Sequence, residues 1–233
     1  MNRRFIHPAT LFFLLTILIA VLSWVGSIYG WAGVQNLLSP EGLRWTLRNV
    51  VYNFLDAPFL GNMLVLLFGV GLWLHSGLWN LCRRLVFRGQ KLSRKEKRAF
   101  VFSLTTGAVC CAVCCLLAFG PWNVVRSIQG TLTDSPFVSG LGYLLSVSIG
   151  LMAVVYGYAI DIYRSDHEIV QGMSYGFIRF SGYFVILFFV SQFFCCLAYT
   201  RLDDFLHLSP REFDILYLVC CIMLLFYQRN SAK

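Results

Sequence analysis

Charge is scarce in this chain of 233 residues. Asp, Glu, Lys and Arg make up only 13% of it, whereas an ordinary soluble domain carries about 25%. Hydrophobic residues reach 58%, which is more than a single soluble core can bury. Regular alternation of polar and apolar residues is also missing, since the apolar runs are continuous. Such runs predict helices in a bilayer, and we expect an all-α polytopic integral membrane protein.

The chain also lacks the motifs of common enzymes. It contains no H-E-x-x-H, G-x-S-x-G or P-loop pattern, and its four histidines are scattered. We therefore expect no enzyme activity, no catalytic residue, no metal site and no cofactor. The net charge of +8 lies largely beside apolar segments rather than on a soluble module, so we expect no nucleic-acid partner.

Apolar segments of bilayer length dominate the chain. A span needs about 20 residues, and we predict six spans, the last of them short: 9–30, 58–81, 99–120, 137–163, 177–200 and 212–227.

In 39–55, Ser39 can cap a helix that begins at Pro40. This helix would separate apolar from basic side chains. This pattern fits an amphipathic helix in the membrane interface or an ordinary connecting helix, and we predict the former. The whole chain, 1–233, is expected to form one transmembrane domain.

Positive charge concentrates in one stretch. Residues 82–98 hold one Glu and eight basic residues, namely Arg83, Arg84, Arg88, Lys91, Arg94, Lys95, Lys97 and Arg98. Cytoplasmic loops of membrane proteins carry such an excess. We therefore predict that 82–98 is a cytoplasmic loop that sets the topology, with both termini in the cytoplasm. Nine cysteines without a disulfide pattern agree with a multi-pass protein of the inner membrane that faces a reducing cytoplasm.

Small residues recur at four-residue spacing in two predicted spans. The stretch "VCCAVCCL" at 109–116 could bind a soft metal through thiolates, but small side chains at this spacing also let helices approach closely. No His or acid accompanies these cysteines, which favours packing. We assign helix packing, within the chain or across a dimer, to Gly107, Cys111, Cys115, Gly142, Ser146 and Gly150.

Polar side chains inside spans usually mark a substrate path, and this chain has few of them. His75 lies near the end of the segment 58–81, while Asn62 and Gln192 lie deeper in their spans. Each residue also has a plainer interpretation, because a His near a span end can reach the interface and amides can hold helices together. We take these three as the candidates for substrate contact.

An ordered series of motifs resembles one family of membrane proteins. The series runs through "HPATLFFLLTILIAVLSWVGSIYG" (7–30), "NLLSPEGLRWTLRNVVYNF" (36–54), "GVGLWLHSGL" (69–78), "LSRKEKRA" (92–99), "SPFVSG" (135–140), "YRSDHEIVQGMS" (163–174) and "SGYFVILFFVSQFF" (181–194). On this series the chain is identified as a member of the p-aminobenzoyl-glutamate transporter (AbgT) family.

The resemblance implies a transporter of p-aminobenzoyl-glutamate or of sulfonamide-type antimetabolites. The expected substrate is then a small organic anion, and the expected partners are the bilayer and a second copy in a dimer or another membrane protein. Members of the family are longer and contain re-entrant hairpins, whereas here 78–86 and 92–99 are joined by few residues and neither hairpin is matched. The chain therefore resembles a shortened member without recognisable transport-core segments. Two functions stay open: a transporter, or a non-transporting scaffold or partner subunit derived from one.

Overall fold

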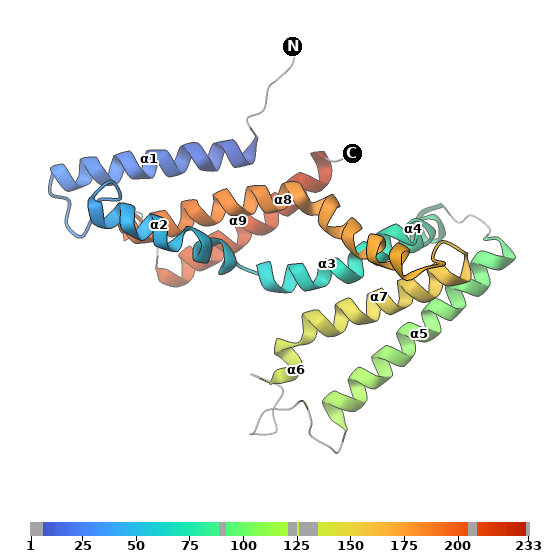
Figure 1. Ribbon diagram of the computed structural model, residues 1–233. Helices are drawn as coiled ribbons and strands as arrows, with labels where there is room; N and C mark the ends of the chain where they lie inside the picture. The colour runs from blue at the N-terminus through green and yellow to red at the C-terminus, as the bar shows by residue number, and fades with distance from the viewer. Residues whose placement is uncertain (1–6, 89–91, 121–124, 126–134, 205–208, 232–233) are drawn as a thin grey trace, which may run out of the picture. The chain divides into compact units, whose positions relative to one another are not determined.

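The computed structural model describes residues 7–88, 92–120, 125, 135–204 and 209–231. Every regular element in these residues is a helix (Figure 1), which confirms the all-α class for them. The helices are α1 Pro8–Ile28, α2 Pro40–Leu55, α3 Leu60–His75, α4 Leu78–Arg88, α5 Arg94–Phe119, α6 Pro136–Ser139, α7 Leu141–Ala159, α8 Asp166–Thr200 and α9 Pro210–Ser231.

Internal contacts divide the chain into two compact units, whereas the sequence led us to expect a single transmembrane domain. The first unit comprises Met1–Leu60 and Ser181–Lys233, and the second unit comprises Gly61–Phe180. Helix α8 contributes its first half to the second unit and its second half to the first unit.

Four helices are long and apolar enough to cross a membrane alone, namely α1, α5, α7 and α8. Helices α2 and α3 together would count as a fifth, broken span. Helix α9 lies where the last span was predicted, but Arg211, Glu212 and Asp214 occupy its first turns, and it is not among the four. The described residues thus support four or five spans, and the predicted count of six is not confirmed.

The predicted segment 58–81 is not one continuous helix. Helix α3 ends at His75 and α4 begins at Leu78. Gly77 between them has a φ of +77°, a left-handed conformation that glycine adopts without strain. The Ser76 hydroxyl accepts a hydrogen bond from the Leu78 backbone N–H at 3.4 Å, which satisfies one free donor of the new helix. Hydrophobicity alone could not predict this break.

The basic stretch 82–98 was expected to be a loop, and most of its described part is helical. Helix α4 extends into it and α5 begins within it. One side of α4 is apolar and buried at Leu78 and Leu81, so the basic side chains can occupy the other side. Lys91 and its two preceding residues lie outside the described residues. The role of this stretch in topology stays a prediction.

Helix α2 begins as the sequence predicts. The Ser39 hydroxyl accepts a hydrogen bond from the Gly42 backbone N–H at 3.0 Å, and Pro40 occupies the first helical position. Such a cap satisfies an N–H group that the helix itself leaves free. The location of this helix in the membrane interface stays a prediction.

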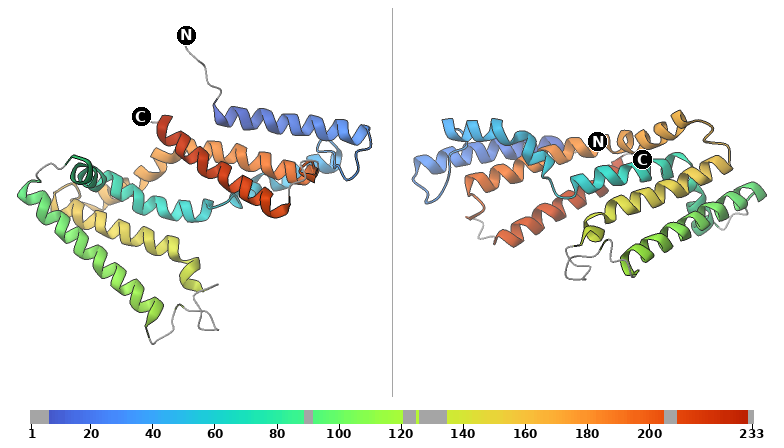
Figure 2. Two further views of the ribbon diagram at one scale, coloured as in Figure 1. Left: turned by 180° about the vertical axis from the view of Figure 1, so that it is seen from behind. Right: turned by 60° about the horizontal axis from the view of Figure 1, so that its bottom comes forward.

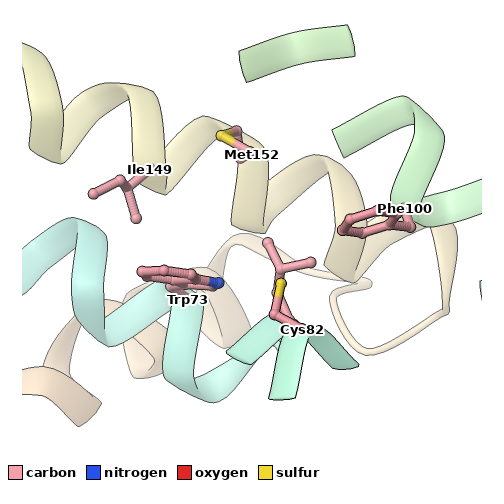
Figure 3. A pocket seen from close by; sticks show the side chains of 6 residues that line it. Trp73, Cys82, Phe100, Ile149 and Met152 are labelled. Atoms are coloured by element: carbon pink, nitrogen blue, oxygen red, sulfur yellow. The ribbon is translucent and has the colours of Figure 1, made fainter. Parts of the chain in front are cut away.

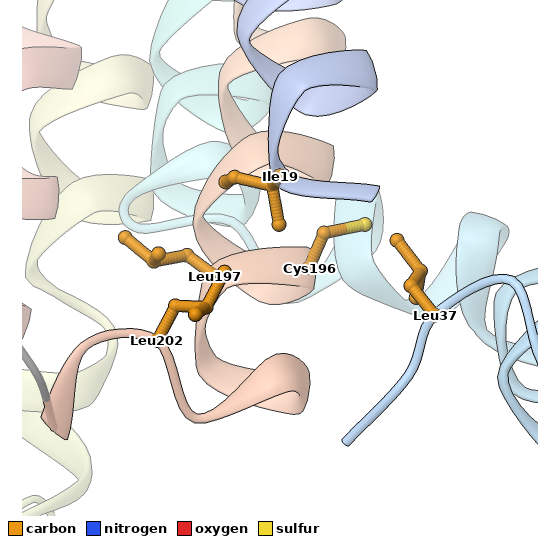
Figure 4. Close-up of a cluster of buried hydrophobic side chains, with 5 residues drawn as sticks. All are labelled: Ile19, Leu37, Cys196, Leu197 and Leu202. Atoms are coloured by element: carbon orange, nitrogen blue, oxygen red, sulfur yellow. The ribbon is translucent and has the colours of Figure 1, made fainter. Parts of the chain in front are cut away.

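The core of the first unit joins α1, α8 and two connections. Figure 4 shows the buried apolar side chains that converge there, namely Ile19, Leu37, Cys196, Leu197 and Leu202. The buried Ser23 hydroxyl of α1 accepts a hydrogen bond from the Leu37 backbone N–H at 3.0 Å. The connection after α1 is further tied to the end of α8, because the Gln35 N–H donates to the Thr200 carbonyl at 3.1 Å.

In the second unit, α5 and α7 run side by side (Figures 1 and 2). The Ser103 hydroxyl donates a hydrogen bond to the Met152 carbonyl at 3.0 Å. A Cβ added at Gly107 would lie 2.6 Å from the Met152 sulfur. Small residues of α5 therefore face α7, which is the usual requirement for close packing of membrane helices.

An ion pair connects the start of α5 to the corner that follows α7. The Lys95 ammonium binds the Asp161 carboxylate, and this hydrogen-bonded contact lowers the pKa of Asp161. Asp161 has a φ of +63°, a conformation that Asp and Asn tolerate better than most residues. Both partners are exposed, so solvent screens the attraction.

We expect Asp161→Asn to remove this ion pair without straining the backbone, because Asn accepts the same φ. A carboxyl with a lowered folded pKa stabilises the fold above its ordinary pKa, and the benefit is lost as the pH falls through the folded value. Thermal unfolding of the purified chain should show a small loss of stability in the variant at neutral pH that disappears in acid. Lys95→Gln should give the same loss. Additive losses in the double variant would contradict the pairing.

Candidate functional site

Helix α3 touches α8 backbone to backbone. A Cβ at Gly71 would lie 2.7 Å from the carbonyl oxygens of Gly172 and Met173. A Cβ at Gly176 would lie 2.4 Å from the Leu67 carbonyl oxygen. Since these are backbone atoms, no change of side-chain conformation could make room. Glycine at both positions is what permits this approach.

The contact of α3 with α7 is equally close. A Cβ at Gly69 would lie 2.2 Å from the Ser146 carbonyl oxygen. The Ser146 hydroxyl accepts a hydrogen bond from the Gly69 N–H at 3.1 Å and donates one to the Val65 carbonyl at 2.6 Å. Val65 and Gly69 are one turn apart, so the hydroxyl bonds to a donor and an acceptor of the α3 backbone. Gly142 and Gly150, one turn to either side of Ser146, also face α3.

An apolar hollow of about 290 Å³ opens along this contact. Its lining comes from α3 and α7 with one residue from α8: Val65, Phe68, Gly69, Leu72, Tyr143, Ser146, Val147, Gly150, Leu151, Val154 and Met173. We call it the α3–α7 hollow. Its volume lies near the lower limit of about 300–1,000 Å³ for small-molecule sites.

Two predicted candidates flank the α3 residues that line this hollow. Asn62 precedes Val65 by one turn, and its amide oxygen lies 3.1 Å from the position of a Cβ on Gly142. His75 follows Leu72 by one turn and is the only ionisable side chain of α3. Asn62 is exposed and His75 is half-buried.

Tyr163 orients the imidazole of His75. Its hydroxyl oxygen lies 3.3 Å from Nδ1 of His75, and the two rings stack with their centroids 5.7 Å apart. The same hydroxyl donates its one proton to the Leu72 carbonyl at 3.3 Å. Tyr163 thus engages Nδ1 of His75 and leaves Nε2 for another partner.

Two glycines make room for Tyr163. A Cβ at Gly157 would lie 2.2 Å from its ring, and one at Gly172 would lie 2.7 Å from its hydroxyl. Tyr163 is 1% exposed, and burial raises the pKa of Tyr163 to about 12. The phenol thus stays protonated at physiological pH and keeps its role as a donor. Sequence reasoning missed this residue, since its partners lie on other elements.

A smaller hollow of about 110 Å³ lies where α3, α4, α5 and α7 meet. Figure 3 shows Trp73 and Cys82 facing Ile149 and Met152 of α7, with Phe100 of α5 beside them. The indole N–H of Trp73 is buried and has no hydrogen-bond partner in the described part of the chain. This second hollow is smaller than the range of about 300–1,000 Å³ for small-molecule sites.

The third candidate, Gln192, lies in the first unit and connects α8 to α2. Its Nε2 donates to the Val50 carbonyl at 2.8 Å, and its Oε1 accepts from Nδ2 of Asn53 at 3.2 Å. Both ends of the amide are engaged, and Gln192 is 9% exposed. This arrangement favours a structural joint over contact with a substrate.

The small residues of α5 that were predicted to pack differ in their exposure. Gly107 lies against α7, whereas Cys111 and Cys115 are exposed. A packing role for these two thiols therefore needs a partner outside the described residues. No group of three His, Cys, Asp or Glu side chains that could hold a metal ion occurs within the described ranges.

Two solved structures share this fold. MtrF of Neisseria gonorrhoeae, from a class of antimetabolite efflux pumps, aligns with a TM-score of 0.77 over 87% of this chain and 71% of its own, at 16% identity. The YdaH transporter of Alcanivorax borkumensis aligns with a TM-score of 0.72 over 86% of this chain and 72% of its own, also at 16% identity. Together with the apolar helices, these similarities define an integral membrane protein with a transporter fold.

The family follows from the sequence. The sequence model of the AbgT putative transporter family matches residues 2–91 and 83–225, and the chain belongs to this family, as its ordered motifs indicated. The p-aminobenzoyl-glutamate transport protein of Escherichia coli strain K12 is 39% identical over 82 residues. That match covers 31% of this chain and only 16% of the relative. The family and its solved relatives are transporters and not enzymes.

We expect Gly71→Ala to destabilise the contact of α3 with α8. Overpacking typically costs about 1–3 kcal/mol, so the purified variant should unfold several degrees below the wild type. Gly61→Ala is the matched control, because it adds the same methyl to the same helix with nothing within 4 Å of it. The control should be as stable as the wild type or more so. Equal unfolding temperatures for the two variants would contradict the close approach.

Proposed function

We propose that this chain binds small aromatic organic anions of the p-aminobenzoyl-glutamate type at the α3–α7 hollow and moves them across the membrane. One observation carries the proposal: in a member of a transporter family, an apolar hollow borders the stretch of α3 between Asn62 and His75. The substrate class comes from the names of the relatives, one a p-aminobenzoyl-glutamate transport protein and one an antimetabolite efflux pump.

The groups around the hollow suit the parts of such an anion. An aromatic ring gains from contact with apolar and aromatic side chains such as Phe68, and from the sulfur of Met173. The amide and carboxylates need hydrogen-bond donors, which Asn62 supplies through its NH₂ group. His75 contacts Tyr163 through Nδ1. Its Nε2 is therefore left as a polar atom at which a carboxylate can bind.

His75→Gln removes the imidazole but keeps a polar side chain of similar length. Cells that produce the wild-type chain should take up or expel labelled p-aminobenzoyl-glutamate faster than cells without it. The variant should lower the protein-dependent flux roughly tenfold or more, since a hydrogen bond to a charged group contributes about 1.5–3 kcal/mol. Membrane levels of both proteins are matched before the fluxes are compared.

His167→Gln is the control for this experiment. His167 is exposed in the first turn of α8 and does not line the hollow, so its variant should keep wild-type flux. Equal flux in the two variants would remove His75 from the site. No protein-dependent flux in cells that produce the wild-type chain well would contradict the proposed transport.

We further propose that the protein resides in the inner membrane with both termini in the cytoplasm. The excess of Lys and Arg in 82–98 supports this orientation, because cytoplasmic ends of spans carry such charge. A reporter enzyme fused after residue 233 should be active only in its cytoplasmic form. Activity of a reporter that requires the periplasm would contradict the orientation.

A second function, a non-transporting scaffold or partner subunit, is favoured by the surface of α5. Only 6% of its most apolar stretch is buried inside the chain, so the rest must contact lipid or another protein. A subunit of this kind would purify together with a defined membrane protein and show no flux alone. Substrate movement by the purified chain without any other protein would contradict it.

A further inference from the structure

Helix α5 enters its apolar stretch from a strongly basic end. Within 82–98 there is a single acidic residue, Glu96. On α4 and the first turns of α5, five basic residues are exposed: Arg83, Arg94, Lys95, Lys97 and Arg98. This concentration of charge lies directly beside a helix that is apolar enough to cross a membrane.

The acidic groups close to this end are already engaged. Glu96 binds Arg84 at 2.9 Å, and Asp161 binds Lys95. Lys97 and Arg98 have no ion-pair partner among the residues that the structure describes. Their charges are therefore available to an anion from outside the chain.

Lys97 and Arg98 share one surface hollow with apolar residues of the next turn. The hollow has a volume of about 220 Å³ and is lined by Lys97, Arg98, Val101 and Phe102. Val101 is 48% exposed and Phe102 is 59% exposed. Four residues along a helix correspond to a rise of about 6 Å. Two cations thus lie one turn above two exposed apolar side chains, and we call this arrangement the basic hollow.

We propose that the basic hollow binds an anionic phospholipid. The phosphate lies between the Lys97 ammonium and the Arg98 guanidinium, both of which bind phosphate through charge-assisted hydrogen bonds. The glycerol backbone and the start of an acyl chain lie along Val101 and Phe102. This site is separate from the α3–α7 hollow and does not depend on the transport activity proposed above.

The apolar half of the hollow distinguishes a lipid from other phosphates. Free phosphate would gain nothing from Val101 and Phe102, which would stay exposed beside it. A phospholipid covers both halves at once, and the polarity changes from charged to apolar along α5 as it does across the surface of a bilayer. Basic clusters beside membrane helices attract anionic lipids in this way.

The test uses the purified full-length chain in detergent and native mass spectrometry to measure bound lipid. Phosphatidylglycerol should bind in preference to phosphatidylcholine with the same acyl chains. Lys97→Gln combined with Arg98→Gln should lower phosphatidylglycerol affinity about tenfold or more and abolish the preference. Phe102→Ala should lower affinity for both lipids, because it removes apolar contact and leaves the cations in place.

The charge-matched control combines Arg201→Gln with Arg211→Gln, two exposed residues that do not line the hollow. It removes the same net charge and should keep wild-type affinity for phosphatidylglycerol. Inorganic phosphate at millimolar concentration should not displace the lipid. Equal losses in the two double variants would overturn the proposal, because net charge would then explain the binding. Displacement by inorganic phosphate would also overturn it in favour of a free-anion site.

Discussion

The second unit depends on how closely α3 can approach its neighbours α7 and α8. Lipid tails are as apolar as the side chains of these helices, so hydrophobic burial does little to hold helices together in a membrane. Close packing and hydrogen bonds must take its place. Gly71 meets the backbone of α8, and Gly69 meets the backbone of α7 at Ser146. A larger side chain at either glycine would separate α3 from a neighbour.

Glycines also border the features on which the proposed function rests. Gly69 and Gly150 belong to the lining of the α3–α7 hollow. Gly157 and Gly172 admit the ring of Tyr163, which in turn fixes the imidazole of His75. In the second unit, residues that pack the helices therefore also form part of the candidate site. The proposed substrate, an aromatic organic anion, would contact the apolar lining of the hollow.

The sequence predicted features that depend on neighbouring residues or on ordered motifs. It did not predict contacts between residues far apart in the chain. The helical class, the family and the cap at Ser39 follow from nearby residues. The four-residue spacing around Ser146 predicted close packing, and the structure places that series against α3. The break at Gly77 and the partners of Tyr163 were missed, because both depend on backbone conformation and on residues far along the chain. Gln192 was chosen as a candidate for its position in a span, yet its hydrogen bonds with α2 favour a structural role.

The central claim is that this chain alone supplies a path for an aromatic organic anion. Reconstitution of the purified wild-type chain into liposomes tests that claim most directly, because no other membrane protein is then present. The account predicts a saturable, protein-dependent flux of labelled p-aminobenzoyl-glutamate that unlabelled substrate inhibits. A folded, correctly inserted chain that gives no more flux than empty liposomes would contradict the account and favour the scaffold or partner-subunit function.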